Sequence, residues 1–116
     1  MRLALPLRLA LGLILLAAFV GTPAQAAEIR HEAVLNGVRL VYWTSRPLVP
    51  GDEPVVFLHG GPGYNSYSFR RTAGARLAAH VAMVYLDQRG SGESERPWRG
   101  DYATASLAED IEALRV

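Results

Sequence analysis

Two apolar segments of this chain each run directly into a glycine-rich turn, and this repeated arrangement restricts the possible folds more than any other feature. Residues 55–58 lead into His-Gly-Gly-Pro-Gly at positions 59–63, and residues 81–86 lead into Asp-Gln-Arg-Gly-Ser-Gly-Glu-Ser at positions 87–94. Both segments are continuously apolar, which is typical of strands buried on both faces of a parallel sheet. Parallel strands end at the same edge of a sheet, where open α/β sheets build their sites. We therefore expect the two turns to form one site.

The neighbouring residues predict the elements that connect these strands. Asn36-Gly37 is a strong β-hairpin signal, so we expect residues 28–35 and 38–44 to pair as antiparallel arms. A helix is expected from position 65 or 66 to about 79, because apolar residues recur there at a spacing of four. These residues are Phe69, Ala73 and Leu77. A strand, a helix and a strand in this order form a right-handed crossover with a parallel pair.

A second helix is expected after the second glycine-rich turn. Ser106 and Glu109 have the spacing of a capping box, which places the start of this helix near Ser106. Its apolar stripe consists of Leu107, Ile111 and Leu114. The predicted fold class is therefore α/β, with an antiparallel hairpin leading into a parallel βαβ unit.

Residues 1–26 have the pattern of a secretory signal peptide. Arg2 and Arg8 supply a positively charged start, positions 9–20 form an apolar or glycine run, and Ala24-Gln25-Ala26 supplies small residues for cleavage. This run is short for a membrane-spanning helix, which needs about 20 residues; an uncleaved anchor is the alternative. We therefore expect a secreted or periplasmic domain of residues 27–116 that meets the membrane only through the signal peptide during export.

Composition excludes several other classes of protein. The chain has no cysteine, which rules out a lipoprotein anchor, disulfide bonds and thiolate metal sites. Without Arg2 and Arg8, ten basic residues face eleven acidic ones, a net charge of −1. A near-neutral net charge without runs of basic residues gives no basic patch that could bind nucleic acid.

The two glycine-rich turns resemble those of the α/β-hydrolase superfamily, and most closely its proline iminopeptidase-like branch. That branch carries His-Gly-Gly-Pro-Gly after the third strand and Asp-Gln-Arg-Gly-x-Gly-x-Ser after the fourth, as this chain does at positions 59–63 and 87–94. The resemblance covers about residues 28–116 and implies the N-terminal portion of an α/β-hydrolase fold. It also implies a serine hydrolase without metal or organic cofactor, acting on a small peptide, amide or ester.

Within this resemblance, the first turn supplies half of an oxyanion hole. In α/β hydrolases one backbone N–H comes from the loop after the third strand and the other from the residue after the nucleophile. Gly61 is the candidate donor here, with Gly60 as the second candidate. His59 looks like a general base in isolation, but the resemblance gives it a structural role that bridges loop segments.

The other motif residues are expected to support the site. Asp87 and Arg89 are expected to form a partly buried ion pair, with Ser94 adding hydrogen bonds. Asp87 precedes any nucleophile, whereas the chain order in this fold is serine, acid, histidine, so it is not expected to be the triad acid. The expected supporting residues are His59, Pro62, Gly63, Asp87, Arg89, Gly90, Gly92 and Ser94.

No Gly-x-Ser-x-Gly nucleophile elbow occurs in the sequence. Ser91 lies in Arg-Gly-Ser-Gly-Glu, which lacks the outer glycines. We therefore expect a domain that is truncated before the elbow, lacks the Ser/Asp/His triad, is inactive by itself and leaves strand 81–86 with an unpaired edge. The alternatives are an esterase or general hydrolase built on the same loops and a non-catalytic fragment.

Dinucleotide binding is a further alternative. Residues 61–66 imitate Gly-x-Gly-x-x-Gly after a strand, and Asp87 ends the next strand near the distance expected for a ribose contact. Ser66 replaces the third glycine, however, and a hairpin precedes the unit. A secreted chain also meets little dinucleotide, so the sequence favours the hydrolase.

We predict cleavage after Ala26, because a short apolar run followed by Ala24-x-Ala26 is a typical signal peptidase site. Intact-mass measurement of the exported protein should give a chain that begins at Ala27. Exported protein that retains Met1 would contradict this prediction and favour a membrane anchor.

Overall fold

The chain folds around a mixed four-stranded sheet in the order β1-β2-β4-β3. The computed structural model describes residues 27–61 and 63–115, so the proposed signal peptide and Pro62 lie outside the described residues. The strands are β1 (Ile29–Leu35), β2 (Val38–Thr44), β3 (Val55–Leu58) and β4 (Met83–Asp87). β1 pairs antiparallel with β2, β2 antiparallel with β4, and β3 parallel with β4. The prediction of a hairpin leading into a parallel pair is confirmed.

The β1–β2 hairpin follows directly from its two turn residues. Asn36 and Gly37 have φ values of 50° and 76°, as a two-residue turn with the twist of the flanking strands requires. The turn fixes the register so that Leu35 faces Val38.

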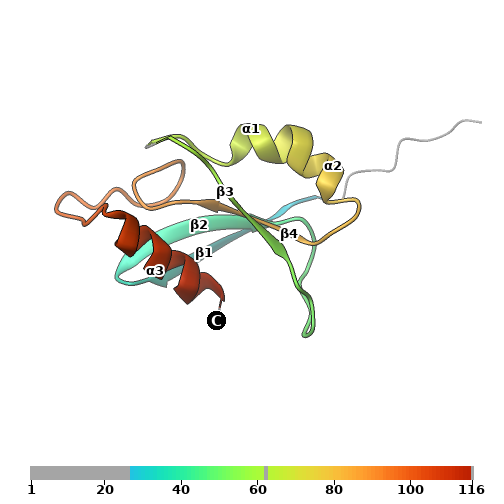
Figure 1. Cartoon of the computed structure of the whole chain (residues 1–116), viewed down its shortest axis with the longest axis horizontal. Helices are drawn as coiled ribbons and strands as arrows, with labels where there is room; N and C mark the ends of the chain where they lie inside the picture. The colour runs from blue at the N-terminus through green and yellow to red at the C-terminus, as the bar shows by residue number, and fades with distance from the viewer. Residues whose placement is uncertain (1–26, 62, 116) are drawn as a thin grey trace, which may run out of the picture.

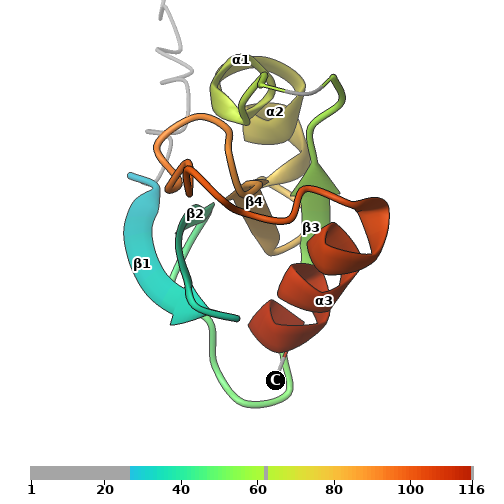
Figure 2. The same cartoon turned by 90° about the vertical axis from the view of Figure 1, so that its left-hand side faces the viewer.

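Helices cover both faces of the sheet (Figure 1). On one face lies a continuous helical segment made of α1 (Tyr67–Phe69), the π-helical turn η1 (Arg70–Gly74) and α2 (Ala75–Leu77). On the other face lies α3 (Thr104–Arg115). Figure 2 shows the sheet between the two. None of the helices in the described part of the chain is long and apolar enough to cross a membrane.

Each helical layer closes its own apolar cluster. Beneath α1 to α2, Phe69 and Ala78 pack against a buried group formed by Val41, Trp43, Met83 and Tyr85. Beneath α3, Ile111 and Leu114 pack against a second group formed by Val38, Leu40 and Leu86. The side chains of β2 and β4 therefore supply the cores of both layers.

An ion pair ties the start of the described chain to the first helical layer. The carboxylate of Glu28 pairs with the guanidinium of Arg70, and both side chains are almost fully buried. The Arg70 guanidinium also lies over the Trp43 ring, 3.7 Å from its centre, where the electron-rich ring face attracts a cation. Glu28 is thus fixed to the domain one residue before β1 begins.

The helix α3 begins earlier than its sequence predicted. Asp101 accepts hydrogen bonds from the Ala103 amide (2.8 Å) and from the Ser106 hydroxyl (2.5 Å). These bonds lower the pKa of Asp101, with the Ser106 bond the larger cause. Because Asp101 holds the first turn, the helix starts at Thr104, and Ser106 lies inside it instead of capping it.

Two expectations about the parallel strands are wrong. β3 is not buried on both faces: Val55, Val56 and Leu58 are 49%, 40% and 42% exposed. In the described part of the chain β3 pairs only with β4, so the unpaired edge belongs to β3. β4, expected to carry that edge, lies between β2 and β3 with all five residues buried. The more buried of the two parallel strands, β4, therefore lies next to the hairpin, and the more exposed one, β3, lies at the edge of the sheet.

Candidate functional site

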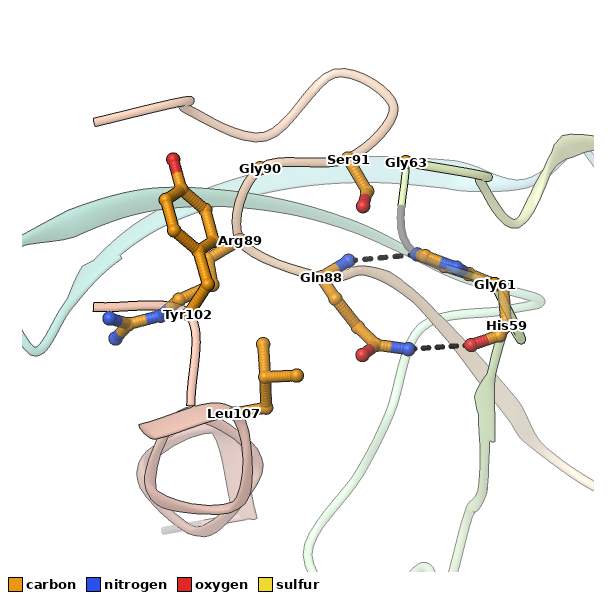
Figure 3. Close-up of a pocket in the computed structure, with 9 residues that line it drawn as sticks. All are labelled: His59, Gly61, Gly63, Gln88, Arg89, Gly90, Ser91, Tyr102 and Leu107. Carbon is orange, nitrogen blue, oxygen red and sulfur yellow. Dashed lines mark hydrogen bonds between the residues drawn. The ribbon is translucent and has the colours of Figure 1, made fainter. Parts of the chain in front are cut away.

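The two glycine-rich turns meet at one edge of the sheet. β3 and β4 run parallel with Leu58 opposite Leu86, so His59 and Asp87 leave the sheet side by side. Two hydrogen bonds then join the turns (Figure 3). The backbone N–H of Gln88 donates to His59 Nε2 (3.2 Å), and the side-chain Nε2 of Gln88 donates to the backbone carbonyl of His59 (2.7 Å). The turn after β4 therefore positions the turn after β3.

These bonds determine what His59 can do. A backbone N–H can only donate, so the lone pair of His59 Nε2 is occupied by Gln88. In the neutral ring the proton then resides on Nδ1, which lies 3.4 Å from the Gly60 carbonyl. A general base needs a lone pair within reach of the nucleophile's proton. The geometry therefore favours a bridging role for His59 over a role as the base.

Gly61 has the features that an oxyanion donor requires. Its φ of 67° lies in the left-handed region, which favours glycine, while no atom lies within 4 Å of the position of a Cβ. Among the described residues, neither the Gly60 nor the Gly61 amide donates a hydrogen bond. Gly61 and Gly63 line the adjoining cavity. A free, fixed N–H beside a cavity can stabilise a developing negative charge.

Asp87 connects three backbone segments and forms no hydrogen bond with Arg89. Its carboxylate, 2% exposed as a residue, accepts hydrogen bonds from the amides of Ser66 (2.8 Å) and Glu93 (2.9 Å). Ser94 Oγ donates to the Asp87 carbonyl (2.5 Å) and accepts from the Val41 amide (2.8 Å). Both carboxylate oxygens of Asp87 are thus engaged, which also disfavours a ribose contact and with it the dinucleotide alternative.

The partner of Arg89 is Asp110 on α3, so the expected Asp87–Arg89 pair is wrong. Arg89 Nε and Nη2 each lie 2.6 Å from a different oxygen of Asp110. Both side chains are almost fully buried, and the hydrogen bond to Asp110 is the main cause that raises the pKa of Arg89. Asp87 is already satisfied by backbone amides, and the guanidinium pairs with the carboxylate that α3 brings to it.

Asp110 is a residue that sequence reasoning missed. Its oxygens also accept a hydrogen bond from Asn36 Nδ2 at 3.0 Å, which joins α3 to the hairpin turn. Its position in the sequence could have shown that it is buried. Asp110 lies three residues after Leu107 and four before Leu114, and both leucines belong to the apolar stripe of the helix. A charged residue on a buried helical face needs a partner of opposite charge or several hydrogen bonds.

A cavity of about 370 Å³ lies between the two turns and α3. Figure 3 shows Tyr102 and Leu107 on one side and His59 and Gly61 on the other. Gly90, with φ 77°, packs so closely on Tyr102 that a Cβ would come within 2.5 Å of the ring. The remaining lining residues are Gly63, Gln88, Arg89, Gly90 and Ser91. The cavity thus combines backbone donors with an apolar wall.

The described residues do not bring together a serine nucleophile and a histidine base; the His31 ring contacts the Thr44 hydroxyl (3.0 Å), away from the two turns. No serine hydroxyl among them lies within hydrogen-bonding distance of a histidine ring. Nor does the described part of the chain contain three or more histidine, aspartate or glutamate side chains placed to hold a metal ion. What the two turns can supply chemically is an anion-stabilising loop and a wall for the substrate.

The chain is similar to known hydrolases in sequence and in fold. Residues 53–116 match the family described as the alpha/beta hydrolase fold. The chain is 34% identical over 84 residues to a soluble epoxide hydrolase of Corynebacterium sp. (strain C12), over 72% of this chain and 27% of that enzyme. It is 38% identical over 71 residues to a proline iminopeptidase of Heyndrickxia coagulans, over 57% of this chain and 24% of that enzyme.

The structural comparison agrees with the sequence comparison. The solved structure of the epoxide hydrolase CorEH without ligand matches with a TM-score of 0.60 and 32% identity, over 76% of this chain and 29% of that chain. The chain therefore spans about a quarter of the length of the curated relatives described above.

We predict that Gly92→Ala destabilises the domain. Gly92 has φ 52°, and a Cβ there would lie 1.9 Å from Asp87 Oδ2 and 2.3 Å from Asp87 Cγ. Overpacking of this kind costs about 1–3 kcal/mol, to be measured by urea unfolding. Gly51→Ala is the matched control, because Gly51 also has a positive φ (94°) but no atom within 4 Å of a Cβ. Equal losses in the two variants would show that the Asp87 carboxylate does not require glycine at position 92.

Proposed function

Because this chain belongs to the α/β-hydrolase fold family, we propose that the full-length protein is a hydrolase in which the Gly61 amide stabilises the oxyanion of the attacked carbonyl. The proposed reaction is acyl transfer to a serine, followed by hydrolysis. The observation that carries the proposal is the position of Gly61: it lines the cavity, and its amide donates no hydrogen bond to another described residue. Two hydrogen bonds to Gln88 hold His59, two residues earlier.

In this mechanism the described residues act on the charge that develops in the reaction. As the nucleophile attacks, the carbonyl oxygen gains negative charge, and a donor fixed beforehand stabilises it without reorganising. Gly60 is the second candidate for this donor. The nucleophile, the acid and the histidine of the triad come from parts of the protein outside these 116 residues, and no metal or organic cofactor takes part.

The proposed substrate is a short peptide from which the enzyme removes an N-terminal residue, proline in particular. The motifs at positions 59–63 and 87–94 and the similarity to a proline iminopeptidase support this specificity. Epoxide hydrolysis is the second candidate, which the similarity to the Corynebacterium enzyme over 72% of the chain favours. An esterase on the same loops is the third. The pattern of residues 1–26 supports a secreted or periplasmic location.

We predict that Gly61→Pro in the full-length protein lowers kcat about 100- to 1,000-fold, because proline removes the donor. The assay uses a proline arylamide, a short-chain ester and an epoxide, so that the preferred wild-type substrate identifies the reaction class. Gly61→Ala is the control: it keeps the N–H at a strained φ, whereas proline also forces φ to about −65°, and this backbone change adds to its loss. A folded Gly61→Pro variant as active as Gly61→Ala would remove Gly61 from the oxyanion hole.

We also predict that the 116-residue chain by itself hydrolyses none of these substrates above background and is not labelled by a fluorophosphonate probe. Covalent acyl transfer needs a nucleophile activated by a neighbouring base, and the described serines have none. Titratable activity from residues 27–116 would contradict this and would give His59 and a nearby serine the catalytic roles. Labelling of the full-length protein is the positive control.

A further inference from the structure

The Asp110 carboxylate joins three segments that are distant in the sequence. It accepts two hydrogen bonds from Arg89, each 2.6 Å long, and one from Asn36 at 3.0 Å. Arg89 Nη1 donates in addition to the carbonyl of Asp101 (2.8 Å). The carboxylate of α3 therefore fixes the turn after β4 against both the hairpin turn and the segment that leads into α3.

This network continues directly into the candidate site. Arg89 is the residue after Gln88, and Gln88 makes both hydrogen bonds to His59. His59 in turn is two residues before Gly61. A shift of the Arg89 backbone would therefore move the Gln88 amide away from His59 Nε2 and release the segment that carries the Gly61 N–H.

The geometry and burial of the pair make it suitable for precise positioning. A guanidinium and a carboxylate joined by two parallel hydrogen bonds have a fixed relative orientation, which a lysine cannot provide. The Arg89 and Asp110 side chains are 6% and 2% exposed, so water cannot replace either partner. Leu107, one turn earlier on α3, lines the same cavity.

We propose that Asp110 is a positioning residue of the site: through Arg89 and Gln88 it holds His59 and the Gly61 amide in the geometry that receives the oxyanion. This inference rests on the proposed function for its catalytic meaning, while the positioning itself is a property of the fold. Asp110 does not touch the substrate, and its effect falls on the rate of the chemical step.

The test compares Asp110→Asn with Glu112→Gln in the full-length protein. Both variants remove one negative charge from α3, but Glu112 pairs with Arg115 on the exposed side of the helix. We expect Asp110→Asn to lower kcat about 10- to 100-fold, the usual effect of a small misplacement in an active site, with KM unchanged. Glu112→Gln should match the wild type in both constants.

Hydrogen exchange supplies a readout that does not depend on activity. In Asp110→Asn the Gln88 amide should exchange faster than in the wild type, while the amides of β4 keep their protection. If the wild type hydrolyses none of the substrates, the proposed function fails, and the exchange of the Gln88 amide alone decides the inference.

A second variant guards against misfolding, because Asp110→Asn leaves a buried arginine without its full partner. Replacing a buried ion pair by apolar side chains often preserves stability, so the double variant Arg89→Met with Asp110→Leu should fold and still show the lowered kcat and the faster Gln88 exchange. Wild-type kcat in either variant would overturn the inference. So would a loss of Gln88 protection that only parallels the loss in β4, which would indicate a merely structural role.

Discussion

A buried carboxylate at the end of the central strand is the constraint on which the site depends. Asp87 is 2% exposed and forms no ion pair with any arginine of the described residues; the amides of Ser66 and Glu93 satisfy its two oxygens. A carboxylate removed from water is costly unless it is hydrogen-bonded. The chain must therefore bring the start of the helical segment and the turn after β4 to the same point, and only glycine fits at position 92, where the backbone passes against the carboxylate.

Two buried carboxylates, those of Asp87 and Asp110, thus determine the structure at one edge of the sheet. Asp87 organises the turns from within through neutral backbone donors, whereas Asp110 approaches from α3 and binds a cation, Arg89. Between them lies Gln88, whose two bonds to His59 join the turns. His59, two residues before Gly61, is thus held in place, and the Gly61 amide donates to no other described residue. A donor positioned before the reaction is what electrostatic stabilisation of a transition state requires.

Local patterns predicted the local structure well. Asn36-Gly37 specified the hairpin, and the apolar segments next to glycine turns specified a parallel pair. One error is local: Asp101 moves the start of α3 to Thr104. The other errors concern contacts between distant residues. Which neighbour β4 takes, and hence the exposure of β3, depends on how the hairpin docks. The partner of Arg89 depends on where α3 packs, and nothing in the spacing of Asp87 and Arg89 shows that Asp87 is already satisfied. The oxyanion role of Gly61 itself remains a prediction.

The ion pair between Glu28 and Arg70 has a consequence for the proposed cleavage of a signal peptide. Glu28 is the second residue after the predicted cleavage site, and its carboxylate is buried against a guanidinium that lies over Trp43. A peptidase must hold several residues on both sides of the scissile bond in an extended conformation. Once the domain has folded, Glu28, the second residue beyond that bond, is no longer available. If residues 1–26 are a signal peptide that is cleaved as proposed, its removal precedes folding, so that cleavage and formation of the domain are separated in time.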